Sequence, residues 1–118
     1  MNLLILFAIL LSQQLMPRKI LLFFDPAKSS LLQLQMDTLA PYQVGMQERE
    51  LEIYSFQKGG HSEEWVKWKV DASHPFTFIL IGKDGTEKFR SEEIIGHKKL
   101  FGLIDAMPMR RWELERKN

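Results

Sequence analysis

The sequence predicts one α/β domain whose central mixed sheet follows the chain order β-α-β-α-β-β-α. Three observations predict this fold class. Two apolar runs without alternation, Arg18–Phe24 and Phe76–Ile81, are typical of strands covered on both faces. The pair Asp84-Gly85 predicts a hairpin directly after the second run. Apolar stripes at helical spacing occur between and after these runs, and 118 residues suffice for one domain.

The first predicted strand, Arg18–Phe24, is expected to lie in the parallel part of the sheet. Asp25 and Pro26 end it. Ser29 or Ser30 can then cap a helix, because a serine oxygen accepts an unpaired N–H group of the first helical turn.

The first predicted helix has an apolar face formed by Leu32, Met36 and Leu39 at spacings of four and three residues. Pro41 removes an internal hydrogen bond, so the helix should kink or restart there. Gly45 marks its expected end.

The middle of the chain predicts a second strand and a short helix. Residues 50–56 alternate between apolar and polar or aromatic positions, which is typical of a strand. Ser62 begins a short helix that holds Trp65 and Trp68 one turn apart. Its charged residues predict that this helix lies on the surface.

The last third predicts a hairpin and a packing helix. Asp84-Gly85 favours a two-residue type I′ turn, which needs positive φ at both positions. Residues 86–91 are polar apart from Phe89, which suits an edge strand. The final helix is predicted from an apolar stripe of Leu100, Leu103, Ile104 and Met107. Pro108 is expected to end this helix.

Composition excludes several classes of function. Sixteen basic and fifteen acidic side chains leave a formal charge of +1, without the basic excess of a nucleic-acid-binding protein. The chain has no cysteine, which excludes disulfides, thiolate metal sites and thiol catalysis. We therefore expect neither thiol-disulfide oxidoreductase nor cysteine peroxidase activity, and no cofactor.

The N-terminus contains an uncharged apolar run over residues 3–11. The run is shorter than the roughly 20 residues of a membrane span, and its length suits the apolar core of a secretory signal peptide. We expect residues 1–16 to be a signal peptide or apolar segment, residues 17–118 to be the mature domain, and the protein to be periplasmic or extracellular. The alternatives are a buried strand or helix of a cytoplasmic protein.

Several segments resemble the thioredoxin fold. The string "TLAP" places Pro41 where thioredoxin-like proteins kink the helix after their first core strand. Pro75 precedes a central strand that runs into a Lys-Asp-Gly turn, as in that superfamily. The resemblance implies a thioredoxin-like fold and a cis His74-Pro75 peptide bond. A trans proline at the strand start is the alternative.

The strings "ILIGKDGTEKFRSEEII" and "LFGLIDAMPMRRWE" resemble a thioredoxin- and peroxiredoxin-like domain of unknown function. That domain occurs in small exported bacterial proteins and in vertebrate extracellular matrix proteins, including sushi-repeat-containing ones. The likeness covers residues 18–113, and "DAMPMRR" is its most specific part. The family implies no settled activity.

The corner between the first strand and its helix is where the thioredoxin fold carries its reactive thiol. Here it holds Asp25, Lys28, Ser29 and Ser30 instead. A serine nucleophile needs an adjacent base, and the resemblance makes His74 the nearest candidate. These residues are the candidate catalytic site of a non-thiol enzyme, whereas plain helix capping is the structural alternative.

A copper site is a second hypothesis. Met107 and Met109 offer soft thioether ligands that suit Cu(I), and His97 lies ten residues before Met107. The alternative is that Met107 only packs, since it belongs to the apolar helix stripe. His61, near two glutamates, is a weaker candidate for which a solvated loop is the simpler interpretation.

The C-terminal segment offers a third candidate site. Arg110, Arg111, Arg116 and Lys117 predict either an anion-binding patch or a solvated tail with local ion pairs. A buried pair between Asp105 and Arg110 or Arg111 is a further option. The three tryptophans predict either a contact surface or partly buried packing; they are Trp65, Trp68 and Trp112.

Together these patterns favour an exported binding or interaction module over an enzyme, with an unknown protein or small-molecule partner. They predict no nucleic-acid partner and no stable membrane span in the mature protein. The non-thiol enzyme and the copper-handling protein are the alternatives.

Overall fold

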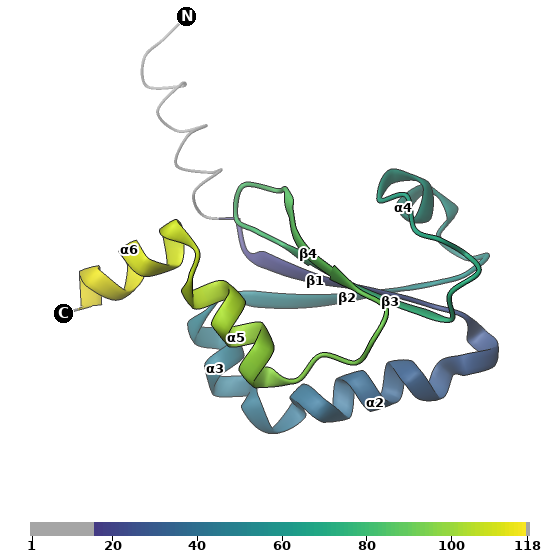
Figure 1. Ribbon diagram of the computed structural model, residues 1–118, viewed down its shortest axis with the longest axis horizontal. Helices are drawn as coiled ribbons and strands as arrows, with labels where there is room; N and C mark the ends of the chain where they lie inside the picture. Colours follow the sequence, from purple (N-terminus) through teal and green to yellow (C-terminus); the bar gives the residue numbers. More distant parts are fainter. Residues whose placement is uncertain (1–15, 118) are drawn as a thin grey trace, which may run out of the picture.

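The computed structural model describes residues 16–117, which form a four-stranded sheet in the order β2-β1-β3-β4 (Figure 1). The strands are β1 (Arg18–Phe24), β2 (Leu51–Gln57), β3 (Phe76–Ile81) and β4 (Glu87–Ser91). β1 pairs parallel with β2 and antiparallel with β3, which pairs antiparallel with β4. The predicted mixed α/β sheet is confirmed.

The two faces of the sheet are covered unequally. The helices α2 (Ser29–Leu39), α3 (Gln43–Glu48) and α5 (His97–Asp105) lie on one side, and the short helix α4 (Ser62–Lys67) lies alone on the other (Figure 1). α6 (Pro108–Lys117) continues beyond one end of the sheet (Figure 1). Only part of the α4 face is therefore covered by a helix.

The alternating side chains of β1 and β3 form a core on each face. On the helix-rich face, Ile20, Phe78 and Leu80 are fully buried against residues of α2, α3 and α5, including Leu100. On the other face a smaller core is built from Leu21, Phe23, Trp65, Ile79 and Ile81. Because both faces of β1 and β3 are buried, their sequences show no alternation.

The first predicted helix is interrupted at Pro41 as expected. α2 ends at Leu39, the 3₁₀ turn η2 (Ala40–Tyr42) follows, and α3 begins at Gln43. The expected helix end at Gly45 is wrong, because α3 continues to Glu48. A Cβ atom at Gly45 would lie 2.7 Å from Cε2 of Phe101. The glycine therefore permits close approach of α5.

The expected serine cap is also wrong. The side chain of Asp25 instead accepts a 3.0 Å hydrogen bond from the Ala27 N–H, which caps the 3₁₀ turn η1 (Pro26–Lys28). α2 then continues from Lys28 without a side-chain cap. Asp25 thus follows the last residue of β1 and is the N-cap of the first helical turn.

The β3–β4 hairpin has a longer loop than the predicted type I′ turn. The N–H of Gly82 donates to the Thr86 carbonyl at 2.9 Å, so Lys83, Asp84 and Gly85 form a three-residue loop. Of these only Gly85 has positive φ, at 80°. Asp84 instead accepts hydrogen bonds from the Thr86 N–H and hydroxyl at 3.0 and 2.8 Å, which hold the loop.

The segment interpreted as a C-terminal tail is helix α6. Pro108 does not simply end α5, because it is also the first residue of α6. A proline is favourable at this position, since the first N–H of a helix has no partner within the helix and the fixed φ suits it. Within residues 16–117, no helix has the length and apolarity that crossing a membrane requires.

Candidate functional site

The corner between β1 and η1 lies beside Pro75. The Asp25 N–H donates a 3.0 Å hydrogen bond to the Pro75 carbonyl, which joins the end of β1 to the start of β3. Residues 16–117 contain no cis peptide bond, so the cis His74-Pro75 bond implied by the resemblance is wrong. The trans bond is lower in free energy by about 0.5–1 kcal/mol, and Pro75 accepts this strand-end contact in the trans form.

The corner does not assemble the predicted serine–histidine pair. Ser29 and Ser30 are exposed at the start of α2. Nδ1 of His74 lies 2.9 Å from a Glu92 carboxylate oxygen, and Nε2 lies 3.5 Å from an oxygen of Asp71. Both ring nitrogens of His74 therefore face carboxylates rather than a serine hydroxyl. Nothing in this geometry activates a serine as a nucleophile.

The three proposed copper ligands are not brought together. His97 begins α5 and stacks on the Tyr42 ring, with 3.6 Å between ring centroids. Met107 follows the far end of α5, roughly 12 Å or more away by helical rise. Met107 and Met109 border a hollow of about 240 Å³ that Arg18, Lys83 and Lys88 also line. Asp84 also lines this hollow and pairs with Lys88 at 2.8 Å, while Arg18 and Lys83 pair with Glu113.

The Asp105–Arg110 pair is formed, and it belongs to a larger cluster of ionised groups. Nε of Arg110 donates to the Asp105 carboxylate at 3.1 Å, and Arg49 donates to both oxygens of Asp105 at 3.1 and 2.8 Å. Arg110 is 3% exposed, whereas Arg111 is exposed. The proposed pair is therefore made by Arg110.

The second half of the cluster surrounds Glu113 of α6. Arg18 is 1% exposed and donates to both carboxylate oxygens of Glu113, at 3.4 and 3.2 Å. Nζ of Lys83 lies 2.7 Å from the same carboxylate and also pairs with Glu50. Arg110 contacts Glu113 at 3.4 Å and so joins the two halves. The ion cluster comprises Arg18, Arg49, Glu50, Lys83, Asp105, Arg110 and Glu113.

The electrostatics of the ion cluster favour charged carboxylates. Burial alone would raise the pKa of Asp105, but the hydrogen bonds from Arg49 and Arg110 outweigh it and lower that pKa. Burial also opposes ionisation of Glu113, whose pKa is nevertheless lowered by hydrogen bonds from Lys83 and Arg18. The ion cluster fixes α6 to the end of the sheet, and its guanidinium groups are already occupied by carboxylates.

The remaining predicted residues are dispersed. Trp65 is buried and packs edge-on against Phe23, with ring centroids 5.3 Å apart. Trp112 is exposed on α6, where the guanidinium carbon of Arg116 lies 3.9 Å from its ring centroid. The tryptophans therefore form no common surface. Lys28 is exposed beside the corner, and His61 packs edge-on against Phe56 at 5.5 Å.

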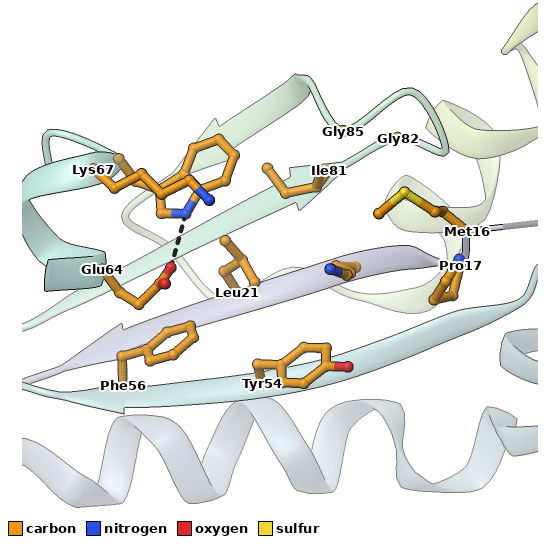
Figure 2. A pocket seen from close by; sticks show the side chains of 12 residues that line it. Met16, Pro17, Leu21, Tyr54, Phe56, Glu64, Lys67, Ile81, Gly82 and Gly85 are labelled. Atoms are coloured by element: carbon orange, nitrogen blue, oxygen red, sulfur yellow. Dashed lines mark hydrogen bonds between the residues drawn. The ribbon is translucent and has the colours of Figure 1, made fainter. Parts of the chain in front are cut away.

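The structure adds a site that the sequence reasoning missed: a cleft of about 350 Å³ on the α4 face of the sheet (Figure 2). Leu21 lies between the rings of Tyr54 and Phe56 on one side and the α4 side chain of Lys67 on the other (Figure 2). We call this hollow the sheet-face cleft. Its lining includes Lys19, Leu21, Tyr54, Phe56, Glu64, Lys67, Trp68 and Ile81.

The sheet-face cleft combines an apolar base with polar groups at its border. Leu21 and Ile81 belong to the smaller core, and Tyr54 is 41% exposed. The indole N–H of Trp68 donates to the Glu64 carboxylate at 3.1 Å, drawn as a dashed line in Figure 2. The hydroxyl of Tyr54 donates to Glu52, which raises the pKa of Tyr54 and keeps the phenol neutral.

The alternation of β2 indicated which side chains share this face, because Glu52, Tyr54 and Phe56 are spaced two residues apart along the strand. No local pattern indicated that α4 would be too short to cover them. The cleft exists because a helix of six residues spans only about 9 Å, less than a seven-residue strand.

Comparison with known proteins identifies the family. A family model described as Domain of unknown function (DUF4174) matches residues 10–113. The chain belongs to this family. No curated protein matches this DUF4174 chain.

The solved structures similar to this DUF4174 domain have the thioredoxin fold. One is thioredoxin-2, a component of the malaria parasite protein secretion machinery, with a TM-score of 0.60 and 19% identity over 77% of this chain and 84% of that one. Another is Trxlp from Edwardsiella tarda, with a TM-score of 0.58 and 17% identity over 82% and 90% of the two chains.

The reduced 2-Cys peroxiredoxin of Plasmodium vivax is also similar, with a TM-score of 0.57 and 15% identity over 86% of this chain and 80% of that one. At these identities the likeness shows the fold alone. The predicted thioredoxin-like fold is confirmed, on a DUF4174 chain without cysteine.

Proposed function

We propose that this DUF4174 domain is an exported binding module without thiol chemistry, and that its ligand is a small organic anion with an apolar body. The observation that carries this proposal is the sheet-face cleft. Its volume of about 350 Å³ lies in the range of small-molecule sites, and its base is formed by core side chains.

The charges at the cleft favour an anion. Lys19 and Lys67 both line it, and their ammonium groups lie 5.8 and 5.2 Å from the ring centroids of Tyr54 and Trp68. Two carboxylates of the described residues lie near these lysines: Glu64 accepts the indole N–H of Trp68, and Glu52, beside Lys19 in the sheet, accepts the hydroxyl of Tyr54. A carboxylate bound here therefore meets two ammonium groups, while its apolar portion contacts Leu21 and Ile81.

Binding also suits this chain better than catalysis at the corner. The hydroxyl groups of Ser29 and Ser30 are exposed, and the His74 nitrogens face Glu92 and Asp71. The absence of cysteine excludes the thiol chemistry of the similar folds. The cleft needs no reactive group to function.

Titration with decanoate tests the cleft, using as readouts the tryptophan fluorescence, to which Trp68 in the cleft contributes, and the NMR signals of Leu21 and Ile81. Decanoate has an apolar chain and one carboxylate, and decyltrimethylammonium is the matched cation. We expect decanoate to bind at least ten-fold more tightly, because two ammonium groups attract one ligand and repel the other.

Variants locate the binding. Replacing both Lys19 and Lys67 by glutamine should weaken decanoate binding about ten-fold, close to 1.4 kcal/mol. Lys98→Gln on α5 is the matched control, since Lys98 is exposed outside the cleft. Equal affinity for the two surfactants, or an equal loss in the control, would contradict the proposal.

Export is supported by the apolar run of residues 3–11, which lies outside the described residues. The intact mass of protein recovered from the periplasm or medium tests it. We expect a chain that lacks residues 1–16. A protein that stays in the cytoplasm with these residues attached contradicts export and leaves the cleft proposal to its own test.

A further inference from the structure

β2 is an edge strand whose outer side has no partner strand within residues 16–117. The hydrogen bonds to β1 show which backbone groups point outward. The Arg18 N–H donates to the Glu50 carbonyl, and the Lys58 N–H donates to the Phe24 carbonyl, at 3.0 and 2.9 Å. Because successive residues of a strand point their backbone groups to opposite sides, even-numbered residues face β1. The N–H and carbonyl groups of Leu51, Ile53, Ser55 and Gln57 face away from it.

The other edge of the sheet carries protection that β2 lacks. β4 has five residues, includes Lys88 and Arg90, and has an irregular register beside Ile81. Short length, charge and bulges all oppose pairing with another chain. β2 has seven residues in regular register with β1, and its sequence contains no proline, lysine or arginine. The unprotected edge is suited to accept a strand.

We propose that β2 pairs antiparallel with β2 of a second copy of this chain, which gives a continuous eight-stranded sheet. An antiparallel pair has a two-fold axis, so the assembly closes as a dimer. The register that overlaps all seven residues places Tyr54 opposite its own counterpart. Ile53 then lies opposite Ser55, and Leu51 opposite Gln57, so every outward-facing N–H meets a carbonyl.

Glu52 is the one charged residue of β2, and in this register it lies opposite Phe56 of the second copy. Glu50 and Lys58, which flank the strand, come near each other at the two ends of the pairing. No two like charges face each other. A parallel arrangement in matched register would instead place Glu52 opposite Glu52, which is destabilising. The antiparallel pairing is therefore the one that the sequence of the strand supports.

The dimer would also join two sheet-face clefts. Tyr54 lines the cleft, and side chains directly opposite in a sheet lie on the same face. Each cleft would therefore continue across the two-fold axis into that of the second copy. This dimer does not depend on the proposed ligand, because its contacts are those of the strand edge.

Single-cysteine variants of the full chain test the register, since the chain has no cysteine of its own. Opposite residues of a non-hydrogen-bonded antiparallel pair have Cα atoms about 4.5 Å apart, within disulfide range. Tyr54→Cys should therefore form a disulfide-linked dimer on mild oxidation. Glu52→Cys is the matched control, because its counterpart is offset by four residues, roughly 13 Å along the strand.

Sedimentation equilibrium of the wild type and surface variants provides a second test. The exposed Lys58 follows β2 directly and lies near Glu50 of the second copy in the proposed register, so Lys58→Glu should weaken the dimer about ten-fold through repulsion at both ends of the pairing. Lys98→Glu on α5 is the control and should leave the dissociation constant unchanged. Ser55→Pro should weaken the dimer further by removing an outward N–H, whereas Ser55→Ala keeps that donor.

A wild-type chain that stays monomeric at every attainable concentration would overturn the proposal. So would cross-linking of Glu52→Cys as readily as Tyr54→Cys, because this indicates another register or random collision. Dimerisation that responds equally to Lys58→Glu and Lys98→Glu would place the interface elsewhere and would also overturn it.

Discussion

The two ends of the sheet differ in how their polar residues are used. At the end where β1 meets η1, Asp25 caps a 3₁₀ turn, His74 faces Glu92 and Asp71, and Ser29 is exposed. At the opposite end, Arg18 and Arg110 are buried and bind Glu113 and Asp105. The end that carries thiol chemistry in similar folds is therefore the simpler one here.

In this chain the buried ionic contacts are therefore concentrated at the end of the sheet opposite the β1–η1 corner. In this chain without cysteine, the corner is exposed and is held by one capping carboxylate and one backbone contact to Pro75. The far end carries buried ions, for which removal of one partner is costly. Mutations in the ion cluster should thus lower the free energy of unfolding by more than mutations at the β1–η1 corner.

Breaking the ion cluster should have the largest effect. Glu113→Ala leaves Arg18 and Lys83 without their shared carboxylate, and we expect a loss of about 3 kcal/mol in the free energy of unfolding. Urea denaturation measures it. Glu115→Ala, at an exposed position of the same helix, should change stability by less than about 0.5 kcal/mol. Equal losses in the two variants would show that the ion cluster adds little.

Lowering the pH should destabilise the protein through the ion cluster at the same end of the sheet. The pKa values of Asp105 and Glu113 are lowered in the folded protein. Their ionised carboxylates therefore add to the free energy of unfolding at pH values above the unfolded pKa values of about 4. This stabilisation is lost as the pH falls through the folded pKa values. Stability measured between pH 7 and pH 3 should therefore decline below about pH 4.5. Asp105→Asn should be less stable at pH 7 and should show a shallower decline, whereas an unchanged pH profile would argue against this account.

Mutations at the corner should have the smallest effects. Asp25→Ala removes the cap of η1 and should cost about 1 kcal/mol. Ser29→Ala should cost less than about 0.5 kcal/mol, since its side chain is exposed and does not cap the helix. The same urea experiment compares them. A larger loss in the free energy of unfolding for Ser29→Ala than for Asp25→Ala would show that Ser29, and not Asp25, is the important capping residue.

The strands were predictable because a strand buried on both faces has a continuous run of apolar residues in the sequence. Arg18–Phe24 and Phe76–Ile81 match the predicted ranges, since side chains on both faces of each strand enter a core. The helix break at Pro41 was predictable for an equally local reason, the missing N–H group. The alternation in β2 indicated which residues share a face but not what covers them.

Long-range contacts account for what the sequence did not reveal. Arginine is seldom fully buried, so nothing adjacent to Arg18 indicated its burial or its partner on α6. The polar composition after Pro108 indicated a solvated tail. The residues that hold α6 in place lie far away in the sequence, on β1 and in the β3–β4 loop, so no local pattern pointed to them. The sheet-face cleft depends on the length of α4 relative to the sheet, a relation between distant segments.

The contact between Arg18 and Glu113 joins residues that lie 95 positions apart in the chain. A ribosome must therefore release most of the polypeptide before the guanidinium at the start of β1 can meet its carboxylate. Chains interrupted before residue 113 would expose that cation or bury it without a counter-ion. Such shortened chains should be less stable than the full chain for the same reason as Glu113→Ala, because they lack the carboxylate that Arg18 binds.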